Sequence, residues 1–200
     1  MAGMAPRSDT RRRMVSATLR LLRRRGLHGT GLQEVLAESA APRGSLYFHF
    51  PGGKEQLVRE ALVVEAGRGD RWIRRCLDGS PTVREGFVRM LDEYAALLES
   101  SDFGESCPVA GVALDLGAEP GPLHAACHDA LAGWASTLAE ALEAEGRPAA
   151  EAAALGTTAI AAFEGALLQC RVGRDVTPLR QVAAQAGALL AAPVTPPTSD

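Results

Sequence analysis

Apolar residues recur at steps of three and four along most of this chain, which is the spacing of one buried face of an α-helix. No stretch alternates apolar and polar residues as a half-buried strand does. The pattern therefore predicts an all-α protein. About nine helices are expected, over residues 9–25, 31–38, 42–48, 54–77, 82–100, 107–116, 123–145, 149–172 and 177–191.

Residues that start and stop helices support the first of these boundaries. Gly26 follows the helix over 9–25 and suits its C′ position, which favours glycine. Thr30, with Gln33 three residues later, predicts a capping box at the start of the second helix. The cations Arg23–Arg25 fit the negative end of the first helix dipole, and they also fit contact with phosphate. Both interpretations stay open.

The stretch over residues 36–57 predicts a helix–turn–helix. A tight turn at 39–41 separates two short helices, and Pro42 suits the first position of the second one, where its missing N–H costs nothing. That second helix is too short and too polar to be stable alone, so its neighbours must hold it. Its basic, hydroxyl and aromatic side chains are typical of a helix that enters a DNA groove.

One segment of this region, residues 41–54, resembles the DNA-binding domain of the tetracycline-repressor (TetR) family. It reads Ala-Pro-Arg-Gly-Ser-Leu-Tyr-Phe-His-Phe-Pro-Gly-Gly-Lys, and the resemblance extends over residues 9–60. The Pro-Gly-Gly-Lys ending, together with Ser-Cys-Pro-Val-Ala at 106–110, is similar to the lincomycin- and flavonoid-responsive branch of that family.

The resemblance implies a domain organisation. Residues 9–53 would form a three-helix helix-turn-helix DNA-binding domain, and residues 54–191 a helical ligand-binding and dimerisation domain. A disordered basic arm is expected at 1–8 and a disordered tail at 192–200. Ala40 stands where most family members have glycine, so a positive φ there would strain the alanine modestly.

Seven residues are expected to contact DNA. Arg43 is the candidate for reading a base, because a guanidinium pairs bidentately with guanine O6 and N7. Gly44 lets the backbone approach the duplex, and Ser45 can reach a base edge or a phosphate. The resemblance assigns phosphate contacts to Thr30, Tyr47, His49 and Lys54. For Thr30, helix capping alone is the alternative. The residues expected to pack the small domain instead are Leu46, Phe48 and Phe50.

Charge is unevenly distributed along the chain. The net charge is only −3, yet residues 1–75 carry 15 basic and 7 acidic side chains, whereas residues 76–200 carry 6 and 17. A basic front and an acidic back indicate a polyanionic partner at one end only. With the helix–turn–helix, this favours double-stranded DNA over a merely solvated charged face.

Three further features bear on location. The chain has no run of 18 apolar residues, so no membrane span is expected. Its basic N-terminus lacks the apolar stretch of a secretory signal. The four cysteines are widely spaced, which fits reduced thiols better than a disulfide framework. A cytoplasmic protein is predicted.

The C-terminal half suggests a dimer and a ligand. Small residues such as Gly156 and Gly165 let helices approach closely, and two helices from each chain, over 149–172 and 177–191, could form a four-helix bundle. The resemblance implies this homodimer; packing within one chain is the alternative. A mostly apolar pocket for a small-molecule inducer is also expected. Its candidate residues are Phe87, Tyr94, Cys107, His124, Trp134, Phe163 and Gln169. Core packing is the alternative for each aromatic residue.

Other chemistries find less support. His124, Cys127 and His128 share one helix face at i, i+3 and i+4, but a fourth metal ligand is not evident, so no metal or cofactor is assigned. Gly52-Gly53-Lys54 lacks the rest of a P-loop. Neither a nucleophile elbow nor paired carboxylates indicate an enzyme.

The sequence thus predicts a sequence-specific DNA-binding transcriptional regulator. The favoured form is a repressor that a small apolar or aromatic ligand releases from an inverted-repeat operator. The alternative is a ligand sensor or a metal or thiol sensor that acts without binding DNA directly.

Overall fold

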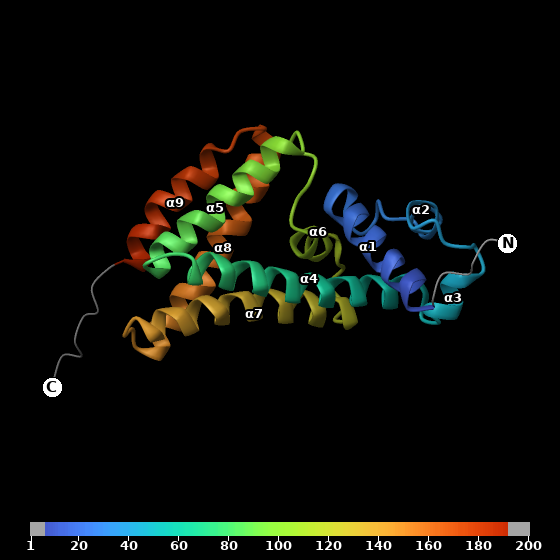
Figure 1. Cartoon of the computed structure of the whole chain (residues 1–200), viewed down its shortest axis with the longest axis horizontal. Coiled ribbons are helices and arrows are strands. Elements are labelled where there is room, and N and C mark those ends of the chain that lie inside the picture. The colour runs from blue at the N-terminus through green and yellow to red at the C-terminus, as the bar shows by residue number, and fades with distance from the viewer. Residues whose placement is uncertain (1–6, 192–200) are drawn as a thin grey trace. The chain divides into compact units, whose positions relative to one another are not determined.

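The computed structural model of the chain describes residues 7–191. The predicted tail at 192–200 lies outside the described residues, as does the predicted arm except for its last two positions. The described part is all-α, as predicted, and has no strand (Figure 1). Its nine helices are α1 (Arg7–Arg25), α2 (Leu32–Glu38), α3 (Ser45–His49), α4 (Gly53–Asp78), α5 (Val83–Ser100), α6 (Pro108–Asp115), α7 (Pro122–Ala144), α8 (Ala149–Gly173) and α9 (Thr177–Leu190).

The described chain divides into two compact units. The first comprises residues up to 67 together with 106–130, and the second comprises 68–105 together with residues from 131 onward. The first unit therefore contains α1, α2, α3 and α6, and α4 and α7 each contribute to both units. Residues 106–130 fold with the N-terminal helices although they are distant from them in sequence.

The core of the first unit is built on one face of α1. Met14, Thr18 and Leu21 are buried along that face. The Thr18 hydroxyl donates to the Met14 carbonyl at 2.9 Å, so burial leaves it satisfied. Gly26 ends the helix with φ +67°, and its N–H donates to the Leu22 carbonyl at 3.0 Å. The predicted C′ glycine is confirmed.

The predicted capping box on α2 is wrong by one residue. Gly31, not Thr30, is the N-cap, and its N–H donates to the Glu34 carboxylate at 3.1 Å rather than to Gln33. Thr30 is buried, and its hydroxyl donates to the Gly26 carbonyl at 2.7 Å. Because Thr30 turns toward the end of α1, the next residue has to begin the cap.

The helix α3 starts three residues later than predicted, at Ser45 instead of Pro42. The Ser45 N–H and hydroxyl both donate to the Pro42 carbonyl, at 2.9 and 2.6 Å. Leu46 and Phe50 are buried as expected, but Phe48 is 64 % exposed, so its predicted packing role is wrong. A helix this short buries one stripe, and a residue two positions from Leu46 lies on the other side.

The expected strain at Ala40 is present, because its φ is +49°. Alanine in the left-handed region costs about 1–2 kcal/mol, whereas glycine tolerates it at the expense of extra freedom in the unfolded chain. Ala40→Gly should therefore raise the free energy of unfolding by roughly 0.5–1 kcal/mol. Chemical denaturation measures it. Ala41→Gly, in the same turn without positive φ, should lower stability, and equal effects of the two substitutions would contradict the explanation.

The second unit is organised around α9, which packs against both α5 and α8 (Figure 1). One face of α5 is apolar and buried, with Phe87, Met90, Leu91 and Leu98 on it. On α8, a side chain at Gly156 would bring its Cβ within 2.3 Å of the Ala135 carbonyl of α7. The expected close approach of helices at small residues therefore occurs here within one chain.

Among the described helices, α8 is the one long and apolar enough to cross a membrane by length and composition, and 39 % of its most apolar window is buried. Its composition reflects alanine and glycine more than large apolar residues. One side of α8 packs inside the second unit, and the other side is exposed.

Candidate nucleic-acid interface and effector site

Residues 43–49 present polar and aromatic groups around α3 in the first unit. Arg43 and Gly44 are exposed, and a Cβ added to Gly44 would meet no atom within 4 Å. Tyr47 is 66 % exposed. His49 is half-buried with its ring edge-on to Phe48 at 5.1 Å. This arrangement exposes the Arg43 cation, the backbone at Gly44 and the rings of Tyr47 and Phe48, with the His49 ring beside them.

The side chains of the other three predicted DNA contacts already form hydrogen bonds within the first unit. Ser45 is half-buried, with its hydroxyl already donating to Pro42. The Lys54 ammonium lies in the first turn of α4 and donates to the Leu27 carbonyl at 2.7 Å. Thr30 is buried, with its hydroxyl on Gly26, so its side chain supports the loop before α2 rather than facing solvent.

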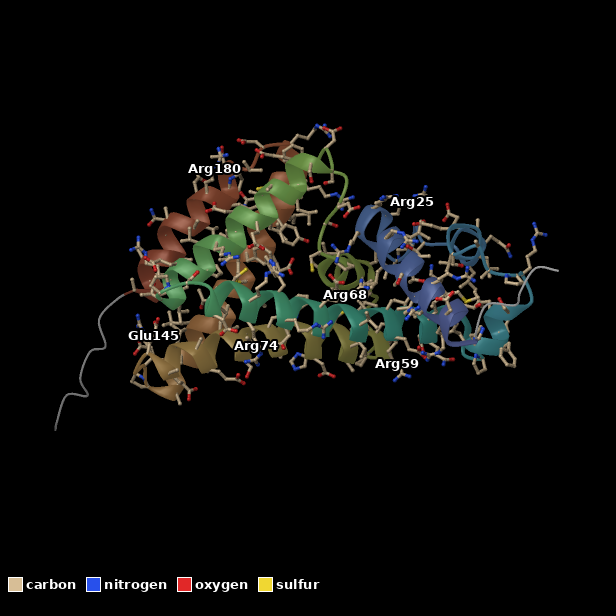
Figure 2. All side chains as sticks on the ribbon, viewed as in Figure 1. Arg25, Arg59, Arg68, Arg74, Glu145 and Arg180 are labelled. Carbon is tan, nitrogen blue, oxygen red and sulfur yellow. The ribbon has the colours of Figure 1, made fainter. Side chains whose placement is uncertain are left out.

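Most arginines of the first unit are matched with carboxylates. Arg25, labelled at the end of α1 in Figure 2, pairs with Glu34. Arg23 pairs with the buried Glu65 at 2.5 Å. Other pairs are Arg11–Glu60, Arg12–Asp9, Arg13–Asp9 and Arg20–Glu38. Within the described residues, no ion pair is formed by Arg43. Its charge is thus directed to solvent beside α3.

Phe48 is the residue of this face that the sequence analysis missed. Its exposure places an apolar ring beside Tyr47, and apolar side chains can contact the thymine methyl group in the major groove. The signal available in the sequence was the spacing itself, since Leu46 and Phe50 at i and i+4 already fill the buried stripe.

Three aromatic rings meet in the second unit. Tyr94 and Phe163 lie 5.2 Å apart in an edge-on arrangement, and Trp72 lies 5.9 and 6.1 Å from them. Trp72 is fixed from its polar end, because its indole N–H donates to Glu93 at 2.8 Å. Phe163 is buried, while the other two rings are half-buried. Trp72, Tyr94 and Phe163 together form the aromatic cluster.

The remaining predicted ligand residues lie outside this cluster. Phe87 of α5 is fully buried, and the Trp134 ring packs against Gly69, where an added Cβ would lie 2.5 Å from the indole nitrogen. Gln169 is on the exposed side of α8. Cys107 and His124 belong to the first unit. The structure thus brings Tyr94 and Phe163 together, and adds Trp72, which sequence reasoning had left unassigned.

The residues His124, Cys127 and His128 do not converge. The His124 ring contacts the Gly117 carbonyl at 2.9 Å, Cys127 is buried with its sulfur near the Val109 carbonyl at 3.7 Å, and His128 is exposed. Burial raises the pKa of the Cys127 thiol to about 11, which makes it a poor nucleophile and metal ligand. In residues 7–191 no group of His, Cys, Asp and Glu is arranged to hold a metal, and all four cysteines are buried and free.

A groove of about 350 Å³ lies in the second unit where the ends of α4 and α7 meet the start of α5. Arg74 and Glu145, both labelled in Figure 2, are among its lining residues. Arg74 is already engaged by Asp70 and Glu140. The lining of the groove includes no ring of the aromatic cluster, so the groove is separate from that cluster.

Two carboxylates of the second unit, Asp70 and Glu93, should make the stability of the fold sensitive to acid. A hydrogen bond from Thr137, supported by Arg74, lowers the pKa of Asp70 below its ordinary 3.8. Burial raises the pKa of Glu93, but hydrogen bonds from Trp72, Arg89 and Arg75 outweigh it and lower the pKa below 4.5. Depressed carboxylate pKa values stabilise the fold above the unfolded pKa, and this stabilisation disappears as the pH falls through the folded value.

The melting temperature should therefore decrease as the pH is lowered from about 5 to about 3. In the double variant Asp70→Asn/Glu93→Gln, this decrease should be smaller. Thermal unfolding followed by circular dichroism at several pH values measures both. An unchanged pH dependence in the double variant would contradict the assignment to these two groups.

The first unit is helical and has an exposed basic and aromatic face at α3, and the second unit is also helical. This combination defines a DNA-binding transcriptional regulator of the helix–turn–helix class. Residues 14–61 match the model of bacterial regulatory proteins of the tetR family, and residues 84–185 match the C-terminal domain of LmrA/YxaF-like transcriptional regulators. The chain belongs to the TetR family of transcriptional regulators, and its C-terminal part is LmrA/YxaF-like.

Full-length relatives and solved structures agree with this membership. The regulator LmrA of Bacillus subtilis is 35 % identical over 174 residues, which cover 87 % of this chain and 93 % of that protein. The regulator Rv0196 of Mycobacterium tuberculosis is 36 % identical, with 91 % and 94 % covered. Both are HTH-type transcriptional regulators by name.

Among solved structures, a cysteine mutant of the TetR-family regulator CifR in complex with 26-base-pair operator DNA is similar with a TM-score of 0.75. It is 27 % identical, and the match covers 96 % of this chain and 99 % of that one. The regulatory protein TetR from Rhodobacter sphaeroides has the same fold, with a TM-score of 0.78 at 22 % identity, over 88 % of this chain and 96 % of that one.

Proposed function

We propose that this protein is a cytoplasmic, dimeric repressor that leaves an inverted-repeat operator when a small aromatic ligand binds. The observation that carries the DNA-binding part is the exposed Arg43 beside α3, in a unit where many other arginines pair with carboxylates. An uncompensated guanidinium at the start of a helix–turn–helix recognition helix suits guanine reading.

The proposed DNA interface follows from this face. Arg43 reads a base, and Gly44 allows close approach of the backbone. Tyr47 and His49 contact phosphates on one side and Lys54 does so on the other, where the N-terminus of α4 adds positive potential. Ser45 reaches the duplex after exchanging its bond to Pro42, and Phe48 supplies an apolar contact.

The proposed dimer uses the exposed sides of α8 and α9. On α8 this side carries no charge over more than four turns. Its members include Ala154, Thr157, Ala161, Gly165, Leu168 and Val172. Val172 is 79 % and Leu168 51 % exposed, and a Cβ at Gly165 would meet nothing within 4 Å. A long uncharged helix face made of small residues suits packing against a second copy in a four-helix bundle.

The proposed effector contacts the aromatic cluster. Planar aromatic molecules gain offset or edge-on contacts with such rings, and the similarity to the lincomycin- and flavonoid-responsive branch makes flavonoid-like compounds the first class to test. The ligand releases DNA only if it binds the two states of the protein with different affinity. The helix α4 carries both Lys54 and Trp72, so it is the element that can link the two sites.

Trp72→Leu should weaken binding of a planar aromatic effector roughly two- to tenfold, because it removes ring contacts that are typically worth about 0.5–1.5 kcal/mol. Operator binding without effector should stay unchanged. Quenching of the remaining tryptophan or calorimetry measures the ligand, and a gel shift with the upstream region of the gene measures release. Phe103→Leu, an aromatic residue outside the cluster, is the control, and an equal loss in both variants would refute the assignment.

A further inference from the structure

The helix α6 is tied to the end of α1 at both of its own ends. Just before α6, the Ser106 N–H and hydroxyl both donate to the Arg23 carbonyl at 3.0 Å. At its C-terminus, Asp115 reaches the loop that follows α1. A side chain at Gly26 would bring its Cβ within 2.7 Å of the Asp115 carboxylate, so any other residue there would have to displace that carboxylate.

The Asp115 carboxylate accepts hydrogen bonds from the backbone of that loop. One oxygen accepts the Leu27 N–H at 2.7 Å and the His28 N–H at 3.2 Å. The His28 ring returns a contact to the Asp115 backbone carbonyl at 3.1 Å. Hydrogen bonds to a charged group are the stronger kind, and these join residues 87 and 88 positions apart.

The same loop also binds Lys54, one of the proposed DNA contacts. The Leu27 carbonyl accepts the Lys54 ammonium at 2.7 Å. Leu27 therefore has its N–H on Asp115 and its carbonyl on Lys54. Through these two hydrogen bonds, the Leu27 backbone links Asp115 at the end of α6 to Lys54 at the start of α4.

We infer that Asp115 is a positioning residue for DNA binding, which acts through the Leu27 backbone to fix Lys54. This inference rests on the proposed phosphate contact of Lys54. With the carboxylate in place, the Leu27 carbonyl holds the ammonium in one location. Without the carboxylate, the Leu27 and His28 N–H groups lose their acceptor, and the Leu27 carbonyl no longer holds the ammonium in that location.

A double-mutant cycle in operator binding tests this inference. Asp115→Ala should lower affinity roughly tenfold. It should also flatten the dependence of log affinity on log salt, by up to about 0.9 for each phosphate that Lys54 no longer neutralises. In the Lys54→Ala background, Asp115→Ala should have little further effect. Asp129→Ala, an exposed aspartate of α7 in the same unit, is the matched control and should leave affinity and slope unchanged.

Two further measurements separate the possible failures. Asp115→Asn retains an oxygen acceptor for Leu27 and should restore most of the affinity even where Asp115→Ala folds poorly. Hydrogen exchange of the Leu27 and His28 amides should accelerate in Asp115→Ala, whether or not DNA is present. If Lys54→Ala binds operator like the native chain, the proposed phosphate contact fails and the inference with it. If Lys54→Ala weakens binding but the two effects multiply independently, the inference alone is wrong.

Discussion

Replacing Ala161 with glutamate should produce monomers and weaken operator binding roughly 10²- to 10⁴-fold. A dimer that engages two half-sites gains this factor from effective concentration alone, without any new contact. Ala161 lies in the middle of the uncharged side of α8 and is exposed within one chain. In the proposed bundle, the introduced carboxylate would be buried beside its counterpart from the second copy, which is strongly unfavourable.

The stability of each chain should change little, because surface substitutions in a helix typically alter it by about 0.5 kcal/mol or less. Ala96→Glu, at an exposed alanine of α5, provides the same change of charge away from α8. Sedimentation equilibrium gives the oligomeric state and fluorescence anisotropy gives operator affinity. A dimeric Ala161→Glu protein with native affinity would show that this face does not form the interface.

Arg43→Ala should remove discrimination at one base pair of each half-site. A bidentate arginine–guanine pair is worth about 1–3 kcal/mol against a wrong base, and a symmetric dimer uses it twice. Binding to unrelated DNA should fall much less, because that binding depends on phosphate contacts. Competition between the operator and operators altered at single positions measures the change in discrimination.

The matched control is Arg59→Ala, which removes an exposed arginine of α4 in the same unit (Figure 2). It should affect specific and non-specific DNA alike. If Arg43→Ala also weakened all sequences equally, Arg43 would be a phosphate contact and the base would be read by another residue, with Ser45 and Phe48 as the next candidates.

Local rules were sufficient for most of the helical layout. Spacing of apolar residues located each helix, Gly26 marked the end of α1, and the residue at position 40 was expected to be strained if its φ were positive, as it is. These features depend on a few neighbouring residues. The same rules erred at Thr30, whose hydroxyl donates to the Gly26 carbonyl four residues earlier instead of capping α2, so that the cap begins one position later.

Other features depend on contacts between distant residues and could not be read from the sequence. The folding of residues 106–130 with the N-terminal helices comes from bonds such as Ser106 to Arg23 and Leu27 to Asp115. The meeting of Trp72 with Tyr94 and Phe163 likewise requires three helices to be in place. The apolar pattern showed which residues turn inward, but not which of them would meet.

The decisive experiment selects genomic DNA fragments with the purified protein and footprints the fragments that it retains. A dimeric regulator of this kind should retain fragments that share an inverted repeat, with half-site centres about 10–10.5 base pairs apart or a multiple of that, each protected by one chain of the dimer. Retention without any shared sequence, or protection of one isolated half-site by a monomer, would contradict this prediction.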